Sequence, residues 1–168
     1  MEILDIVNEQ DEVIGQATRD ECHKDPSLLH RTVHFTLLDK ATNTILLTRR
    51  SFKKTHDAGK LCFLGEHIVS GESYADALKR GVAEELGVTI TSYHELGHNI
   101  FRYDQQSEFV RFFLAEYPGG AITFDKDEME DVEWIKQDSL TSIAGQVSDM
   151  TNHWIKQIQW IKKPQTTN

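Results

Sequence analysis

The segment that most constrains the fold is an amphipathic stretch in the middle of the chain, residues 74–86. The apolar residues that recur there with the period of an α-helix are Ala75, Leu78, Val82 and Leu86. Ser73 precedes the stretch and is a residue type that caps helix starts. Gly87 follows it and can end a helix in the left-handed conformation. The sequence therefore predicts one helix that buries a single face against another layer.

Short apolar and β-branched runs stand on both sides of this helix and predict strands. Before it, the runs cover residues 2–8, 13–19, 31–39 and 43–50, and a short one begins at Cys62. After it, they cover residues 88–103, 108–117 and 131–135. Residues 19–30 read as a polar connection, and residues 139–163 carry a second helical pattern. These spacings favour an antiparallel or mixed sheet with helices packed on it, an α+β fold or a sandwich.

The length of 168 residues fits a single domain, placed at residues 1–163 with a flexible C-terminal tail at 164–168. A net charge of −9 argues against binding to nucleic acid or to an anionic membrane. A local basic patch or a metal ion can still hold a small anionic substrate. Only two cysteines are present, which fits a cytoplasmic protein without a disulfide framework. The oligomeric state is open, and a homodimer is compatible with the sequence.

Two adjacent glutamates, Glu84 and Glu85, stand at the end of the predicted helix, where the helix dipole favours cations. Arg80 lies four residues before Glu84 and can pair with it on one helix face. Paired carboxylates beside a cleft also suit Mg²⁺, which takes a few protein oxygens and keeps water or phosphate oxygens for the rest. A solvated helix end with two exposed charges is the alternative.

Residues 66–88 resemble the Nudix box, a pattern of fixed spacing that begins with a glycine and ends with a glycine and an aliphatic residue. The residues that match the pattern are Glu72, Arg80, Val82, Glu84, Glu85, Gly87 and Val88. Two positions depart from it. Glu66 stands in place of the first glycine, and Gly81 stands in place of the glutamate that follows the arginine.

The resemblance implies a Nudix fold, in which a mixed β-sheet is sandwiched between α-helices. It also implies Mg²⁺-dependent attack of water on the diphosphate bond of a nucleoside diphosphate derivative, with Mn²⁺ as an alternative ion. In that case Glu84 and Glu85 are metal ligands, Arg80 orients a glutamate and Glu72 braces the loop. Gly81 removes one carboxylate that the family uses on metal, so the number of metal ions stays open.

The segment Thr48–Lys54 places four cations in seven residues of an otherwise acidic chain. A solvated loop is one interpretation. A grip on phosphate is the other, and it is favoured because the local charge opposes the charge of the whole chain.

The N-terminal half resembles a narrower branch of the superfamily, that of type I isopentenyl-diphosphate isomerase, through "LDIVNEQDEVIG", "HKDPSLLH" and "LLTRRSFKK". In that enzyme two histidines seven residues apart join a third histidine and two glutamates on a metal ion. His23, His30 and His67 stand at the histidine positions, and Glu108 stands at the second glutamate. The three histidines are therefore either a metal set or a packed remnant of one.

The same branch implies substrate-binding residues. Arg50 and Lys54 match its diphosphate-gripping cations, and Tyr103 lies in a segment that matches the one with its catalytic tyrosine. Glu108 is also a candidate third ligand of the ion at Glu84 and Glu85, and a candidate general base, because the base of Nudix enzymes often comes from outside the box.

Two mismatches oppose isomerase activity. Gly65 stands where the isomerase has its proton-transferring cysteine and is assigned a structural role, while Gln106 stands at the first glutamate. Cys62 lies three residues from Gly65, about 10 Å along a strand. The hypothesis is therefore a hydrolase of a small diphosphate. The rivals are an isomerase with a rearranged site and a non-catalytic nucleotide-binding module.

Overall fold

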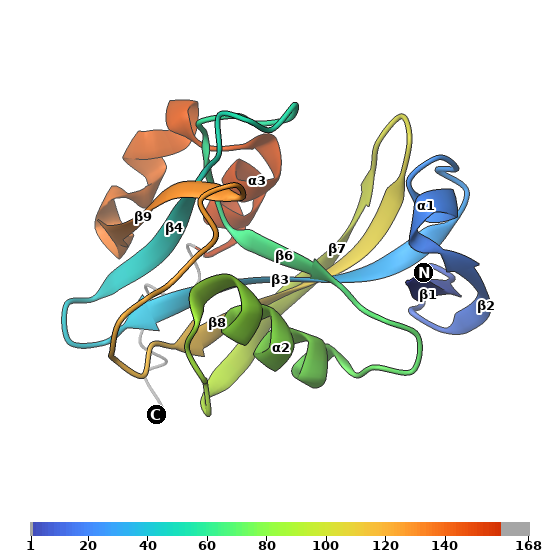
Figure 1. The fold of residues 1–168 in the computed structure, drawn as a ribbon, viewed down its shortest axis with the longest axis horizontal. Coiled ribbons are helices and arrows are strands. Elements are labelled where there is room, and N and C mark those ends of the chain that lie inside the picture. The colour runs from blue at the N-terminus through green and yellow to red at the C-terminus, as the bar shows by residue number, and fades with distance from the viewer. Residues whose placement is uncertain (1, 159–168) are drawn as a thin grey trace, which may run out of the picture.

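The computed structural model describes residues 2–158 (Figure 1). Its elements are, in chain order, β1 (Ile3–Val7), β2 (Val13–Thr18), α1 (Arg19–Cys22), β3 (Leu29–Asp39), β4 (Thr44–Arg50), β5 (Leu61–Cys62), β6 (Leu64–His67), α2 (Tyr74–Leu86), β7 (Tyr93–Arg102), β8 (Ser107–Glu116), β9 (Met129–Lys136), the 3-10 helix η1 (Gln137–Gln146) and α3 (Asp149–Ile158).

Strand β3 is the centre of a mixed sheet. Along almost its whole length it pairs in parallel with β8, from Leu29 opposite Ser107 to Leu38 opposite Glu116. Its other edge is shared in turn by β1, β6 and β4, all antiparallel. The outer pairs β1–β2, β7–β8 and β4–β9 are antiparallel as well. This arrangement confirms the predicted α+β class with a mixed sheet.

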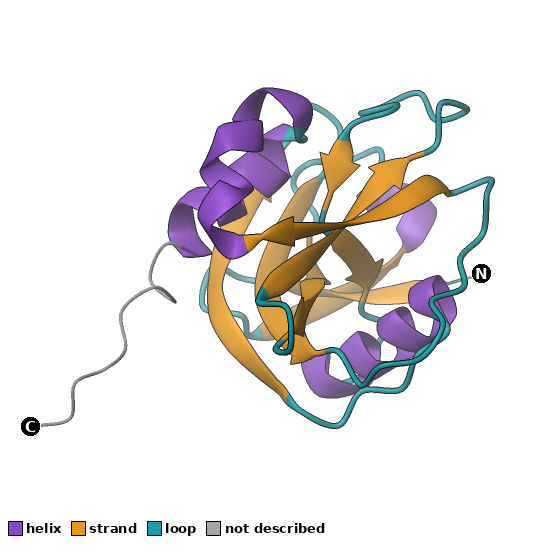
Figure 2. Cartoon of the chain, turned by 90° about the vertical axis from the view of Figure 1, so that its left-hand side faces the viewer, coloured by secondary structure: helices purple, strands orange, loops and turns teal. Residues whose placement is uncertain are grey.

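The two faces of the sheet carry separate hydrophobic clusters, because successive side chains of a strand point to opposite faces. On one face Val33 and Phe35 of β3 pack with Leu78 and Val82 of α2. On the other face β8 packs with the region of α3. Figure 2 shows helices on two sides of the strands. The predicted sandwich of a sheet between helices is therefore confirmed.

Helix α2 begins and ends where its sequence predicts. The Ser73 hydroxyl accepts a hydrogen bond from the Asp76 backbone N–H at the N-cap. Gly87 closes the helix with a φ of 67°, in the left-handed region that favours glycine. A Cβ atom on Gly87 would lie 2.1 Å from the hydroxyl oxygen of Thr123. The glycine is therefore required both by its backbone conformation and by the space around it.

Two predictions about helices are corrected by the structure. The connection after β2 was predicted to be irregular but contains the short helix α1. Thr18 and Glu21 form a capping box at the start of this helix. The second helical pattern is not continuous within the described residues: η1 ends before Val147, and Ser148 caps the separate helix α3 by accepting from the Thr151 backbone N–H. In both places a hydroxyl side chain caps the start of a helix, and at Ser148 this cap separates α3 from the preceding helical segment.

The expected tail at residues 164–168 lies outside the described residues.

Candidate active site

Strand β6 divides the candidate residues into two groups. It pairs with β3 so that Glu66 lies opposite Val33, while Gly65 lies opposite His34 and His67 opposite Thr32. Glu66 therefore points to the face covered by α2, and Gly65 and His67 point to the other face. Two polar clusters result, one on each side of the same strand.

The acidic cluster lies on the α2 side and consists of Glu66, Glu72 and Glu84, which contact Arg80, and of Glu85, which lies beside Glu66. The Arg80 guanidinium donates two hydrogen bonds to Glu72, at 2.9 and 3.0 Å. Its Nη1 atom lies 3.2 Å from carboxylate oxygens of both Glu66 and Glu84, and its Nη2 donates to the His67 carbonyl at 2.8 Å. One cation thus serves several carboxylates, which leaves the cluster with an excess of negative charge.

The pKa values of Glu85 and Glu66 are raised by burial and, in addition, by neighbouring carboxylates. Burial raises the pKa of Glu85 to about 7, and the neighbouring carboxyl of Glu66 adds to the effect. Burial also raises the pKa of Glu66, although Arg80 opposes the change. Glu84 lies at the rim, with 59% of its side chain exposed. A divalent cation among these oxygens would relieve the repulsion, so the donor set fits Mg²⁺.

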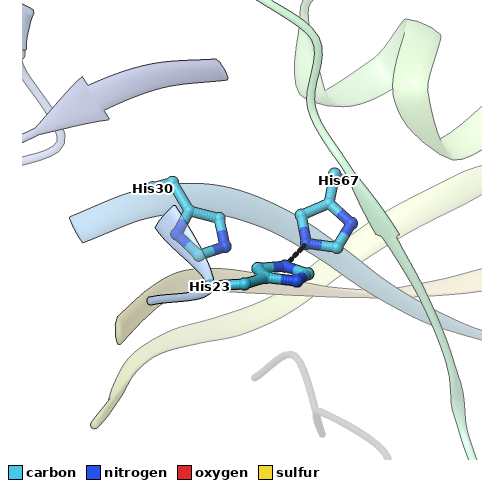
Figure 3. A group of neighbouring side chains, drawn as sticks. All are labelled: His23, His30 and His67. Carbon is cyan, nitrogen blue, oxygen red and sulfur yellow. Dashed lines mark hydrogen bonds between the residues drawn. The ribbon is translucent and has the colours of Figure 1, made fainter. Parts of the chain in front are cut away.

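The histidine cluster consists of His23, His30 and His67 on the opposite face (Figure 3). One ring nitrogen of each residue lies within 4.8 Å of those of the other two. The Nε2 atoms of His23 and His67 are 2.9 Å apart and share a hydrogen bond. Burial lowers the pKa of His30 to about 4 and that of His67 to about 2. The rings are therefore neutral at pH 7, as metal ligation requires.

Among the buried polar atoms that lack a hydrogen-bond partner within the described part of the chain, three belong to strand residues in or beside the histidine cluster. They are His30 Nε2, Thr32 Oγ1 and Glu108 Oε2. The register explains their proximity, because Glu108 lies opposite His30 in the parallel β3–β8 ladder and Thr32 lies opposite His67. Unpaired buried polar atoms are rare and call for an explanation. A metal ion bound by nitrogen and oxygen donors fits this group.

Glu108 is thus placed beside the histidine cluster rather than beside Glu84 and Glu85. Its side chain is buried, and burial raises its pKa to about 7. One carboxyl oxygen accepts a hydrogen bond from the Gln106 side chain at 3.0 Å. The acidic cluster therefore draws its carboxylates from β6, α2 and the loop between them.

Gly65 makes room for His34, which also points to the histidine side. A Cβ atom on Gly65 would lie 2.9 Å from the Cδ2 and Nε2 atoms of the His34 ring. The ring is buried, and burial lowers its pKa to about 3. Any side chain at position 65 would therefore have to displace His34.

Arg50 at the end of β4 and Lys54 in the loop that follows it are engaged with neighbouring groups. The ammonium of Lys54 is paired with the carboxylate of Glu128. The negative charge of Glu128 in turn raises the pKa of Glu85. Lys54 therefore lies at the edge of the acidic cluster. Arg50 donates from its Nε to the His56 carbonyl at 2.9 Å and forms no ion pair with a carboxylate among residues 2–158.

Tyr103 lies after β7, with 41% of the residue exposed and its ring stacked on Phe101. Its pKa is raised by burial and then by the nearby carboxylate of Glu108. The structure therefore brings Tyr103 to the histidine side of the sheet, together with Glu108.

Comparisons with known proteins assign the family. A sequence profile described as NUDIX domain matches residues 28–158. An uncharacterized Nudix hydrolase from Yersinia pestis is 30% identical over 146 residues, which cover 84% of this chain and 77% of that protein. The crystal structure of DR0079 from Deinococcus radiodurans superposes with a TM-score of 0.74 at 27% identity, and the match covers 92% of this chain and 98% of that chain.

A second solved structure is the NUDIX domain of Shewanella oneidensis NrtR, complexed with ADP ribose. It gives a TM-score of 0.64 at 18% identity and covers 88% of this chain and 100% of that chain, a likeness that concerns the fold. This chain belongs to the NUDIX family, as the match of the family profile to most of its length shows. Within residues 2–158, no helix combines the length and the apolar character that a membrane span needs.

The structure adds residues that the sequence did not single out for a site. Thr32 and His34 lie on the histidine side, and Glu128 lies beside Lys54. Period-two alternation along 30–36 is the signal that could have indicated the first two, because it aligns them with His30 on one face. Glu128 had no such signal, since its position depends on the loop that precedes β9.

Proposed function

We propose that this chain is an Mg²⁺-dependent pyrophosphohydrolase. Its substrate would be a nucleoside diphosphate derivative or a similar small diphosphate, and water would cleave the diphosphate bond. The observation that carries the proposal is the acidic cluster of a NUDIX-family chain, in which Glu84 and Glu85 occupy Nudix-box positions. Glu84 and Glu66 both contact Arg80, and Glu85 lies beside Glu66. When bound there, a divalent ion would neutralise phosphoryl oxygens and activate water.

The other residues of the cluster would hold this geometry. Glu72 binds Arg80 through two hydrogen bonds and also accepts from the Val69 backbone N–H at 3.1 Å. The turn before α2 is thereby tied to the helix. Arg80, held in this way, would keep the carboxylate of Glu84 aimed at the metal side of the cluster.

Arg50 and Lys54 would bind the diphosphate. The Nε atom of Arg50 donates a hydrogen bond to the His56 carbonyl, and the guanidinium has further N–H groups that could bind substrate. An arginine can bind two phosphate oxygens at once. Lys54 would exchange its partner Glu128 for a phosphate oxygen. Because the pair lies near Glu85, such an exchange would bring the substrate to the acidic cluster.

The histidine cluster would form a second metal site. Nitrogen donors suit Zn²⁺, Mn²⁺ or Fe²⁺ better than Mg²⁺. The unpaired atoms of His30 and Glu108 support this site, and Glu108 would act there as a ligand or as a general base. A carboxyl group with a pKa of about 7 is suited to proton transfer near neutral pH. Tyr103 would line the same side.

Isomerase activity is an alternative to the hydrolase proposal, and the contact between Gly65 and His34 is evidence against it. A cysteine at position 65 would collide with the buried His34 ring. Cys62 lies on β5 instead, where burial raises the pKa of its thiol. The proton-transferring thiol of the isomerase branch therefore has no counterpart at this position.

The test is turnover of a panel of nucleoside diphosphate derivatives with Mg²⁺ and with Mn²⁺, by the wild-type protein and the Glu85→Gln variant. We expect Glu85→Gln to lose Mg²⁺-stimulated hydrolysis while its circular dichroism spectrum stays unchanged. Glu116→Gln, which removes a carboxylate paired with Lys40 at the far end of β8, serves as the control. Unchanged turnover in Glu85→Gln would refute the assignment.

A binding module without catalysis is the rival from another class, because Gly81 and Glu66 depart from the box. Tight nucleotide binding by the wild-type protein without any turnover would support it. Proton exchange into isopentenyl diphosphate, followed by NMR, distinguishes the isomerase from both.

A further inference from the structure

The two positions at which the chain departs from the Nudix box touch each other. A Cβ atom built on Gly81 would lie 2.5 Å from Cγ of Glu66 and 3.3 Å from its Cβ. It would also lie 3.0 Å from Cε1 of Phe35, a buried core residue. The stem of the Glu66 side chain thus fills the space in which a side chain at position 81 would begin.

The carboxyl group of Glu66 reaches the centre of the acidic cluster from that position. One of its oxygens lies 3.2 Å from Nη1 of Arg80, the atom that also contacts Glu84. The carboxyl group of Glu85 lies close enough to Glu66 for the negative charge of Glu66 to raise the pKa of Glu85. Only 19% of the Glu66 side chain is exposed, so the group is held among these partners rather than in open solvent.

We propose that Glu66, projecting from β6, supplies the carboxylate that the box glutamate after the arginine would supply from α2. This proposal rests on the proposed function, since it assigns a third protein ligand to the same divalent ion. In this arrangement Glu66 and Glu85 bind the ion together, and Glu84 contributes from the rim. The carboxylate would thus come from β6 instead of α2 while it occupies the same place in the cluster.

The geometry also explains why the two departures occur together. A glutamate at position 81 with Glu66 unchanged would overlap the Glu66 stem and add another carboxylate beside a single guanidinium. A glycine at both positions would leave the buried space empty and remove a ligand. Only the exchange of the two residue types keeps the volume and the number of carboxylates constant.

The first experiment measures Mg²⁺ binding by isothermal titration calorimetry, without substrate. Mg²⁺ is the probe because the histidine cluster disfavours it. Glu66→Gln keeps the size of the side chain, and we expect it to weaken Mg²⁺ binding by about tenfold. Glu116→Gln should bind as the wild-type protein does. Wild-type affinity in Glu66→Gln would overturn the inference.

The second experiment restores the family arrangement. The double variant Glu66→Gly with Gly81→Glu should bind Mg²⁺ at least about fivefold more tightly than Glu66→Gly alone, because the two sites are coupled. A folded double variant that binds no better than the single one would overturn the inference. If the double variant does not fold, the Mg²⁺ affinity of Glu66→Gln alone tests the inference.

Glu85→Gln separates this inference from the proposed function. If Glu85→Gln loses Mg²⁺ binding and Glu66→Gln does not, the hydrolase proposal stands and the role of Glu66 is refuted. If neither variant affects Mg²⁺ binding, both proposals fail together.

Discussion

Replacement of Glu108 by glutamine should change how the stability of the protein depends on pH. The Glu108 side chain is buried, with 6% of the residue exposed, and one of its oxygens has no partner among residues 2–158. Burial raises its pKa from 4.5 to about 7. Between these values the folded protein keeps a proton that the unfolded chain has released.

The sign and size of the effect follow from linkage. Unfolding releases a proton in this interval, so rising pH favours the unfolded state, and wild-type stability decreases with pH. Between pH 5 and pH 8 the loss attributable to Glu108 is about 2–3 kcal/mol. Glutamine stays neutral at every pH and avoids this loss. The Glu108→Gln variant should therefore gain that amount relative to the wild-type protein as pH rises from 5 to 8.

The assay is thermal or urea unfolding of both proteins at pH 5, 6, 7 and 8 in the presence of a chelator. The other titrating groups are common to both proteins, so the difference between the two curves isolates position 108. For a domain of this size we expect the difference in melting temperature to grow by about 5–10 °C over this range. Glu116→Gln, which removes a partly exposed carboxylate whose pKa is lowered by hydrogen bonds from Lys40 and Ser92, should not reproduce the gain. Parallel curves for Glu108→Gln and wild type would refute the reasoning.

Two further predictions concern the histidine cluster and the end of α2. Protein purified as His23→Ala should contain less zinc or manganese than the wild type by elemental analysis, because one of three clustered ring nitrogens is lost; identical metal content would count against the site. Gly87→Ala should lower stability by about 1–3 kcal/mol in a melting experiment, since it places a Cβ on left-handed backbone and against Thr123; an unchanged melting temperature would contradict this reason.

The parts of the fold that depend on residues close together in the sequence could be predicted from the sequence. Helix α2, its cap at Ser73 and its end at Gly87 follow from local periodicity and residue type, and the structure confirms them. The separation of η1 from α3 was missed, because the apolar pattern continues across Ser148 while its hydroxyl caps a new helix. Local patterns therefore identify elements more readily than the breaks between them.

The arrangement of the candidate site could be predicted only in part. Glu84 and Glu85 were indicated by their place in the box, and the three histidines by the resemblance to the isomerase branch. The same resemblance grouped Glu108 with the histidines, and the parallel pairing of β3 with β8, which joins distant parts of the chain, is what brings them together. The contact of Glu66 with Gly81 likewise joins a strand to a helix. In the sequence these two residues could be recognised only as separate departures from a pattern.

The alternation along β6 has a consequence for how this chain can change by insertion or deletion. Glu66 and His67 are neighbours in sequence but face opposite sides of the sheet. Removing or adding one residue in β6 would exchange the two sides, placing an imidazole among the carboxylates and a carboxylate among the imidazoles. Such an indel could not spare one cluster and lose the other. Variants with insertions or deletions in β6 should therefore keep both clusters or neither. Insertions or deletions of two residues should be tolerated better than those of one residue.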